Sequence, residues 1–471
     1  MSRTMAVVGG GVTGLACALR LTEISREKGA GWDVALLESG KRPGGVIATE
    51  KEKGCILESG PDALFTEKPW GVEFLKKLGL ESEIIGTRAG FRKSFVFRRG
   101  RLHPVPEGFY LIAPSQLLPL MTTPLFSLKG KLRALGDLFL PAGPSNGDES
   151  LESFVTRRLG REVHDRLAQP MVAGIYSSRS SELSLKATFP RFLELERKYG
   201  SVIRGLMSAK RVPSRGPRYS LFVSLSGGMG SMAEKAAASL PAGTFKPGHA
   251  VKSLRYAGGK GSALEIAGDG FRLTADAVCL ALPAYASADV IRGLSADLAG
   301  ELDGIPYHTG ATVNLLYGRR DVPHSLDGFG YVVPETEKLS VTGCTFSSVK
   351  FPGRAPEGTA LLRAFAGGRD ESGFFSLSDD DLAVAARREV EKALGIRAEP
   401  LLVRVARHPK SLPQYRVGHL EKAARIEERL REFPRLALAG NAYYGVGIPD
   451  CVRAGEQAAE RMAEAVSRLF P

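Results

Sequence analysis

The sequence predicts a mixed α/β and α+β fold, in which a discontinuous Rossmann-like domain is joined to a mixed-sheet domain and a mostly helical domain. At the N-terminus, the apolar run 5–8, a glycine-rich loop, a helical pattern over 12–24 and a second apolar run at 34–37 follow one another. That order is typical of a βαβ unit. Strand-like runs recur much later, at 275–282 and 436–439. The Rossmann-like sheet is therefore predicted to collect strands from three distant parts of the chain.

The run 436–439 leads into a second glycine-rich turn that contains Gly440, Gly445 and Gly447. A helix is expected next, capped by Asp450 and continuing with apolar residues at helical spacing. The start and the end of the chain thus share one design, a strand followed by a glycine turn and a helix.

The segments between these pieces differ from one another in pattern. Residues 115–205 read as mostly helical, whereas 303–365 contain strand-like runs at 311–317, 330–333 and 360–365. These two regions predict the helical domain and the mixed sheet.

Composition bounds the class of protein. The 471 residues are 43% hydrophobic and 24% charged, as in ordinary globular proteins. A net charge of +13 fits an anionic partner such as a dinucleotide, a carboxylated substrate, nucleic acid or an acidic lipid surface, and equally fits a solvated surface with no partner. The sequence has no regular series of aromatic stacking residues in its basic segments, so nucleic acid is the least favoured of these.

Cysteine and histidine spacing argue against a metal site. The five cysteines are scattered and lack a CxxC pair, which favours reduced thiols in a cytoplasmic protein. No HxxxH or HxxH spacing occurs, so no metal is expected. The apolar start is interrupted by Gly9–Gly11, unlike a signal sequence, and prolines break the uncharged stretch 108–128. A peripheral contact of that stretch with the inner face of the cell membrane and a buried loop-and-helix segment are both left open.

The N-terminal loop has the chemistry of a dinucleotide site. Gly9 permits the tight turn, Gly11 lets a pyrophosphate approach the backbone, and Gly14 allows the helix to pack close to the strand. Glu38, which ends the next strand, would accept hydrogen bonds from ribose hydroxyls. This pattern alone serves NAD and FAD alike.

Two further features favour FAD. Arg42, Gly44 and Gly45 form a second glycine turn with a cation just beyond Glu38, which suits an extended dinucleotide. The C-terminal glycine turn offers a second helix N-terminus that would favour negative charge on a reduced flavin ring.

Two segments are strongly basic. Residues 92–103 contain five Lys or Arg and no acidic residue, and they read either as a hairpin with solvated charges or as a carboxylate-binding rim. Residues 191–218 contain eight Lys or Arg against two acidic residues, which would suit anionic lipid or substrate.

Several longer motifs resemble one known family. They are VVGGGVTGLACALRL, ESGKRPGGVI, LESGPDALF, LFSLKGKLRALGDLFLP, LAQPMVAGIYSS, LPQYRVGHLEK and GNAYYGVGIPDCVRAGEQA. Over nearly its whole length the chain resembles the oxygen-dependent protoporphyrinogen and coproporphyrinogen oxidases of haem synthesis, within the monoamine-oxidase-like flavoproteins.

The resemblance implies a set of FAD and substrate contacts. The implied FAD contacts are Gly9, Gly10, Gly11, Val12, Thr13, Gly14, Glu38, Ser39, Arg42, Gly44, Gly45, Val46, Gly60, Pro61, Asp62, Ala63, Val251, Asn441, Val446, Gly447 and Ile448. The implied substrate contacts are Lys93, Ser94, Arg98, Gly174, Val332, Thr345 and Phe365. No catalytic residue is assigned, and Tyr415 and His419 are equally consistent with structural roles.

The resemblance also implies the domain limits. They are 1–85, 220–300 and 412–471 for the FAD-binding domain, 86–114 and 301–411 for the substrate-binding domain, and 115–219 for a helical domain whose contact with a membrane is left open.

The implied chemistry is hydride transfer from a porphyrinogen carbon to flavin N5, with reoxidation by O2 to H2O2, repeated three times. Ser94, preceded by Lys93, stands where some protoporphyrinogen oxidases have an arginine, and the phrase RKSFVF looks like the Gram-positive type. The sequence therefore favours coproporphyrinogen III over protoporphyrinogen IX. A flavin amine oxidase, a desaturase and a non-catalytic carrier are the alternatives. A downstream haem-pathway enzyme is open as a partner, and the oligomeric state is not predicted.

Overall fold

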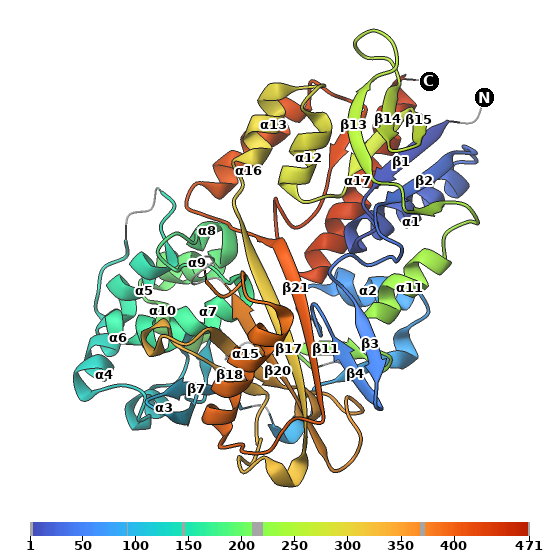
Figure 1. Ribbon diagram of the computed structural model, residues 1–471. Coiled ribbons are helices and arrows are strands. Elements are labelled where there is room, and N and C mark those ends of the chain that lie inside the picture. The colour runs from blue at the N-terminus through green and yellow to red at the C-terminus, as the bar shows by residue number, and fades with distance from the viewer. Residues whose placement is uncertain (1–2, 92, 144–146, 210–219, 368–372, 470–471) are drawn as a thin grey trace.

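A computed structural model describes residues 3–91, 93–143, 147–209, 220–367 and 373–469. Two sheets dominate it, one near the chain ends and one at the opposite end of the molecule, with a helical region beside the second (Figure 1). The predicted fold class, mixed α/β and α+β, is confirmed.

The sheet near the chain ends is parallel and has five strands. Its order is β12 (Phe245–Pro247), β2 (Asp33–Glu38), β1 (Thr4–Val8), β16 (Ala277–Leu280) and β22 (Leu436–Leu438). These strands are short runs of apolar residues, and the three central ones are almost fully buried, as expected for parallel strands covered on both faces.

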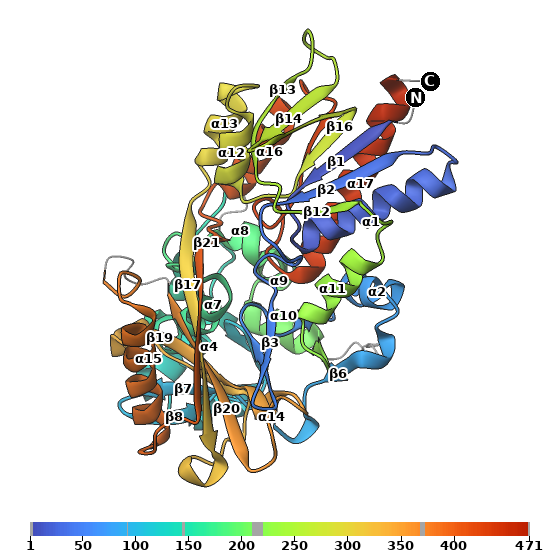
Figure 2. The same ribbon diagram turned by 45° about the vertical axis from the view of Figure 1, so that its right-hand side comes forward.

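Helices cover both faces of this sheet (Figure 2). One face packs against α1 (Val12–Glu27), α2 (Pro69–Lys77), α11 (Gly230–Ala238) and α17 (Ile448–Leu469). The other packs against α12 (Ala284–Ile291), α13 (Ala296–Asp303), α16 (His419–Leu430) and a small sheet of β13 (Val251–Tyr256), β14 (Leu264–Gly268) and β15 (Phe271–Ala275).

The second sheet is mixed and has seven strands. Its order is β21 (Leu402–Pro413), β17 (Tyr307–Gly318), β20 (Thr359–Gly367), β19 (Val341–Phe346), β18 (Gly330–Val332), β7 (Phe95–Arg98) and β8 (Arg101–Pro104). Only the β18–β7 pair is parallel. One face packs against α15 (Asp379–Leu394), whose N-terminus is capped by Ser378 and followed by three aspartates, and which ends at Gly395.

The helical region lies beside the second sheet (Figure 1). It contains α3 (Leu117–Thr122), α4 (Leu128–Leu135), η3 (Gly136–Leu138), α5 (Leu151–Leu159), α6 (Arg161–Val163), the π-helical turn η4 (His164–Ala168), α7 (Gln169–Tyr176), α8 (Leu185–Thr188), α9 (Pro190–Tyr199) and α10 (Val202–Ala209). None of the described helices combines the length and hydrophobicity that spanning a bilayer requires.

Short elements connect these layers. They are β3 (Thr49–Glu52), β4 (Cys55–Glu58), β5 (Leu64–Phe65), η1 (Glu81–Glu83), β6 (Ile84–Gly86), η2 (Ala89–Phe91), β9 (Phe109–Tyr110), β10 (Ala113–Pro114), β11 (Phe222–Leu225), η5 (Arg319–Asp321), η6 (Glu335–Glu337) and α14 (Ser347–Lys350). All five cysteines are buried and unpaired, as predicted. Of the two basic segments, residues 92 and 210–218 lie outside the described residues.

Candidate functional site

The glycine loop joins β1 to α1 and is held by close packing. A Cβ atom on Gly14 would lie 1.8 Å from the carbonyl oxygen of Gly9, and one on Gly9 would lie 2.5 Å from that of Ala281. Gly9 also has a φ of 107°, a conformation that side chains oppose. These glycines are therefore required by the backbone itself.

Gly11, unlike Gly9 and Gly14, is not required by close packing. A Cβ atom there would meet no atom within 4 Å, so the loop presents bare backbone to open space at the start of α1. The first turn of α1 contains no acidic side chain. Because the N-terminus of a helix carries partial positive charge and free N–H groups, this arrangement fits a pyrophosphate.

Glu38 and the second glycine turn lie against this loop. The Glu38 carboxylate accepts hydrogen bonds from the backbone N–H of Gly10 at 2.6 Å and of Gly40 at 2.7 Å. Gly44 donates its N–H to the Gly10 carbonyl at 2.8 Å. The Arg42 guanidinium donates to the carbonyls of Pro43, Gly45 and Ile47, so it stabilises its own turn.

Other predicted flavin segments converge on the same place. His249 N–H donates to the Glu38 carbonyl at 2.8 Å, which brings the start of β13, with Val251, beside Ser39. A Cβ on Gly60 would lie 2.0 Å from the Val46 carbonyl oxygen, so the Gly60–Ala63 segment packs against the second glycine turn. Although distant in sequence, these predicted residues are neighbours in the structure.

The C-terminal turn, residues 439–447, is held by side chains from outside it. The Tyr415 hydroxyl donates to the Asn441 carbonyl and accepts the Gly445 N–H, both at 2.7 Å. His419 Nε2 lies 3.0 Å from the Tyr443 carbonyl oxygen, and its ring stacks on Tyr415 with centroids 3.9 Å apart. Tyr415 and His419 therefore have a clear structural role in shaping the turn that contains Asn441.

The helix after this turn begins earlier than predicted. Asp450 was expected to cap it, but α17 starts at Ile448, which places Asp450 in its first turn. The Asp450 carboxylate accepts hydrogen bonds from Lys68 Nζ at 2.6 and 2.7 Å. A Cβ on Gly455 would lie 2.2 Å from the Thr13 carbonyl oxygen, so α17 packs tightly along α1.

One face of the seven-stranded sheet, which we call the site face, gathers the predicted substrate residues. Strand register sets Val332 opposite Gly343, Phe365 opposite Gly343, and Thr345 opposite Gly330 and Arg363. Side chains of directly paired residues lie on the same face of a sheet. The opposite face is the one covered by α15.

Residues of the site face meet both neighbouring layers. Asn314 and Thr312 on β17 donate to the carbonyls of Glu58 and Ser59, next to the Gly60–Ala63 segment. Gly174 of α7 lies across from Val332, since a Cβ on Gly174 would be 4.0 Å from Val332 Cγ1. The site face therefore lies between the flavin segments and the helical region.

Of the predicted carboxylate-binding residues, Arg98 ends β7 of the β7–β8 hairpin, and Lys93 and Ser94 directly precede β7. Lys93 is exposed and contacts Asp327 at 3.3 Å, whereas the Ser94 carbonyl accepts the Val105 N–H at 2.8 Å. Arg98 is half-buried and shares the site face with Val96. Its pKa is lowered chiefly by burial and further by the neighbouring cations Arg166 and Arg99, while Glu162 and Glu337 act in the opposite direction.

Two polar residues of the site face were missed by sequence reasoning. Arg363 and Asn314 are paired across β20 and β17, and both side chains are buried. The sequence LLRAFAG could have indicated Arg363, because it is the single charged residue of an otherwise apolar strand and stands two positions before Phe365. Alternation in a strand places residues i and i+2 on one face.

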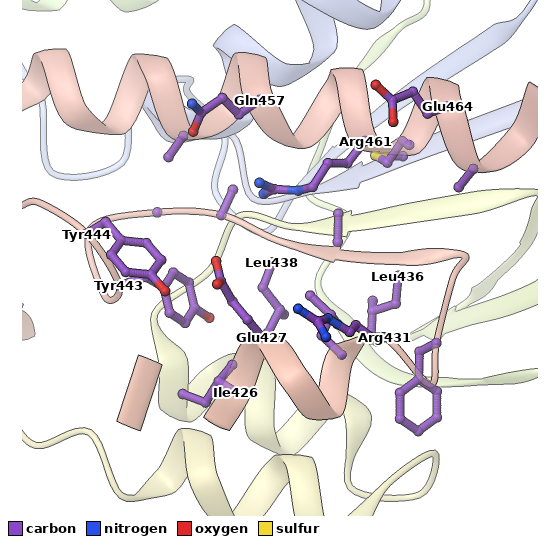
Figure 3. Close-up of a pocket in the computed structure, with 18 of the residues that line it drawn as sticks. Ile426, Glu427, Arg431, Leu436, Leu438, Tyr443, Tyr444, Gln457, Arg461 and Glu464 are labelled. Atoms are coloured by element: carbon purple, nitrogen blue, oxygen red, sulfur yellow. The ribbon is translucent and has the colours of Figure 1, made fainter. Parts of the chain in front are cut away.

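A separate cavity of about 800 Å³ lies on the outer side of the C-terminal turn. Figure 3 shows it between α16 and α17, with Glu427 and Arg461 extending from the two helices into the space. None of the predicted flavin residues lines it. This cavity is thus distinct from the candidate flavin site.

Comparisons with known proteins agree with this geometry. The family model described as "Flavin containing amine oxidoreductase" matches residues 12–463. Coproporphyrinogen III oxidase of Bacillus subtilis is 34% identical over 98% of both chains, and chloroplastic protoporphyrinogen oxidase of Oryza sativa is 32% identical over 99% of this chain and 89% of its own. The crystal structure of a protein titled putative protoporphyrinogen oxidase from Exiguobacterium matches with a TM-score of 0.86 and 30% identity over 99% of both chains.

The family match resolves the choice between NAD and FAD that the glycine loop left open. A dinucleotide loop in a flavin-containing family identifies the cofactor as FAD. The chain belongs to the flavin containing amine oxidoreductases.

Proposed function

We propose that the protein is an FAD-dependent oxidase that converts a porphyrinogen to the porphyrin in haem biosynthesis, with O2 as acceptor and H2O2 as product, and that it prefers coproporphyrinogen III. The observation that carries the proposal is the site face, where Val332, Thr345 and Phe365 come from three strands. Arg363, on the same face, donates to the carbonyl of Gly60 in the Gly60–Ala63 segment. A face that combines apolar side chains with the buried polar groups of Asn314 and Arg363 suits a large macrocycle that bears polar groups. The names of the relatives above support the same activity.

FAD, when bound, would accept hydride from the substrate and pass electrons to O2. The chain's own contribution begins with binding. The N-terminus of α1 and the bare backbone at Gly11 would hold the pyrophosphate, and Glu38 would hold ribose hydroxyls in place of its present bonds to Gly10 and Gly40. The braced turn with Asn441 would support the flavin ring.

The substrate would be oriented by shape and by charge. Val332, Thr345 and Phe365 would contact the macrocycle, and the backbone at Gly174 would contact it from the helical side. Arg98, half-buried on the site face, would attract propionate groups. Holding the reacting carbon near the cofactor, away from water, is the main contribution that these residues make to the rate.

Substrate preference is tested by aerobic turnover of coproporphyrinogen III and protoporphyrinogen IX, followed by porphyrin fluorescence. We expect the higher kcat/KM with coproporphyrinogen III, whose four carboxylates, against two, make better use of a basic rim. A higher kcat/KM with protoporphyrinogen IX would reject the preference, and turnover of neither would reject the proposed function.

The role of the hairpin is tested by Arg98→Glu combined with Arg101→Glu. We expect KM for the porphyrinogen to rise roughly tenfold or more, as for the loss of charged hydrogen-bonding groups, with unchanged flavin absorbance. The matched control is Arg388→Glu with Lys392→Glu, the same charge change on α15 at the opposite face of the sheet. Equal KM values for both double variants would make the hairpin a solvated surface.

We also propose that the helical region contacts an acidic membrane surface. Four large apolar side chains are strongly exposed there, and Lys129, also exposed, lies among them. They are Leu118, Leu128, Leu132 and Phe139, with 75%, 67%, 57% and 83% of their surface exposed. Apolar residues beside cations are the composition of interfacial membrane contacts.

Vesicle co-sedimentation tests this contact. We expect binding to anionic but not to zwitterionic vesicles, and a loss of binding in Leu128→Glu with Phe139→Glu. Val384→Glu with Leu401→Glu adds the same charges at exposed apolar positions outside the helical region and should leave binding intact. No binding of the unaltered protein to anionic vesicles would reject the contact.

A further inference from the structure

Five charged side chains are buried or half-buried where the Gly60–Ala63 segment meets the site face. They are Glu58, Asp62, Lys350, Arg354 and Arg363, called the junction cluster below. Three cations and two carboxylates thus share a region that is largely shielded from water. Buried charges are costly unless paired and hydrogen-bonded.

Both carboxylates of the junction cluster have partners other than Arg363. Asp62 accepts hydrogen bonds from Lys350 Nζ at 2.8 and 3.1 Å. Glu58 accepts from the Thr49 hydroxyl at 2.7 Å and from the Met229 N–H at 2.8 Å, and it lies 3.7 Å from Arg354. Neither carboxylate is hydrogen-bonded to Arg363.

Arg363 is the least satisfied cation of the cluster. Its side chain is only 3% exposed, and its Nη2 donates to the Gly60 carbonyl. Its Nε and Nη1 have no hydrogen-bond partner, and neither has Oδ1 of Asn314, the residue paired with it on β17. Burial lowers the pKa of Arg363 against the attraction of Asp62 and Glu58. Unpaired donors and an unpaired acceptor therefore lie on adjacent strands in a buried place.

The location of these atoms points to a ligand. The guanidinium of Arg363 binds Gly60, a predicted flavin contact, and its Cζ lies 4.8 Å from the ring centroid of Phe365, a predicted substrate contact. On the other side, its strand partner is Thr345, a third predicted contact. Arg363 therefore lies between the two binding regions.

Among the other buried arginines, Arg354 of the junction cluster also has one unpartnered nitrogen, Nη1, whereas an arginine outside the cluster is fully paired. Arg158 in α5 is 1% exposed, and its nitrogens donate to the Asp137 carboxylate and to the carbonyls of Asp137, Pro141 and Gly200. None of its nitrogens is unpartnered. Since native proteins pair nearly all buried polar atoms, the free atoms of Arg363 call for an explanation.

We propose that Arg363 is a ligand-contacting residue, whose Nε and Nη1 donate hydrogen bonds to an oxygen acceptor of the bound flavin or of the porphyrinogen, with Asn314 Oδ1 accepting from an adjacent N–H. This proposal rests on the proposed function. Both molecules have the required chemistry, because the flavin ring has carbonyls beside an N–H and the porphyrinogen has carboxylates and pyrrole N–H groups. Guanidinium is well suited to both kinds of oxygen.

The test is Arg363→Lys, which keeps the charge but cannot reproduce the planar set of donors, and Arg158→Lys is the matched control. If the acceptor belongs to FAD, the dissociation constant of FAD rises roughly tenfold or more, as for a charged hydrogen bond, and the visible absorption bands shift. If it belongs to the porphyrinogen, KM rises by a similar factor while FAD binding stays constant. Arg158→Lys should lower Tm and change neither quantity.

Two outcomes would overturn the proposal. In the first, Arg363→Lys leaves both the FAD affinity and KM within about twofold of the unaltered protein, while Tm falls as in the control. Loss of a charged hydrogen bond would change one of these two quantities by more than twofold. The second applies even if the variant does not fold: a crystal structure of the unaltered protein with FAD and porphyrin in which Nε and Nη1 of Arg363 contact neither molecule. If the unaltered protein oxidises neither porphyrinogen, the proposed function fails, and FAD affinity with that crystal structure still decides the role of Arg363.

Discussion

The two turns of the candidate flavin site are stabilised in opposite ways. The N-terminal loop requires residues without a Cβ atom, because a Cβ on Gly14 would collide with the backbone of Gly9. The C-terminal turn depends on side chains that are supplied from elsewhere, chiefly the Tyr415 hydroxyl and the His419 ring. Close packing at Gly14 tolerates no larger residue, whereas the C-terminal turn loses stability in steps as each side-chain contact is removed.

The largest effect is expected at Gly14. Gly14→Val would place side-chain atoms where α1 meets the Gly9 carbonyl, 1.8 Å from the first added carbon. We expect a loss of about 3 kcal/mol or more in the free energy of unfolding, and with it the loss of bound flavin. Thermal unfolding and the visible spectrum of the purified protein measure both.

Gly11→Ala is the control within the same loop. No atom lies within 4 Å of the added carbon, and Gly11 has an ordinary φ of −67°. We expect the flavin-free protein to keep its Tm while its affinity for FAD falls. A Tm loss as large as that of Gly14→Val would show that the loop does not distinguish packing from binding positions.

A smaller effect is expected at Tyr415. Tyr415→Phe leaves the Gly445 N–H and the Asn441 carbonyl without their shared partner, at a cost of about 1–3 kcal/mol, part of which should appear as weaker FAD binding. Tyr317→Phe removes a hydroxyl that contacts Glu391 on α15, away from the site face. That control should lower Tm alone, and equal FAD affinities in the two variants would contradict the bracing role.

The smallest effect is a pH dependence at His419. Burial lowers the pKa of His419, so the unfolded chain binds the proton more readily than the folded one. The stability that neutral His419 provides is complete above the ordinary histidine pKa of about 6.5 and is lost as the pH falls below it. His419→Gln, whose amide can still donate to the Tyr443 carbonyl, should reduce the fall in Tm on acidification. An unchanged fall would assign the acid sensitivity to other groups.

The N-terminal loop was predictable because its constraints are local. Gly9, Gly11 and Gly14 lie within six residues of one another, and Glu38 ends the next strand, so spacing alone conveys their roles. The order of strand, glycine turn and helix at the C-terminus was predictable for the same reason. Even there, the predicted start of α17 was wrong by three residues, since Asp450 lies in the first turn of the helix and pairs with Lys68 instead of capping it.

The rest depended on contacts between distant segments. Nothing near Tyr415 in sequence indicates that its hydroxyl bridges Asn441 and Gly445. Arg363 illustrates the same limit, since its meaning comes from the register of β20 against β17 and from the approach of Gly60. The resemblance to known oxidases supplied residue assignments on the site face that periodicity could not have supplied.

The two longest strands have a mechanical consequence. β17 and β21 pair from Tyr307 with Pro413 down to Leu316 with Leu402, running from the flavin domain to the far end of the second sheet (Figure 1). Tyr307 is anchored at its upper end by a hydrogen bond from the Ala284 N–H. The register shifts between His308 and Gly310, and from Gly310 to Leu316 the pairing is continuous, so bending along that part would strain the ladder. We therefore expect slow hydrogen exchange along 311–316. We also expect a porphyrinogen to enter through motions of the surrounding loops and helices, while this part of the sheet stays rigid.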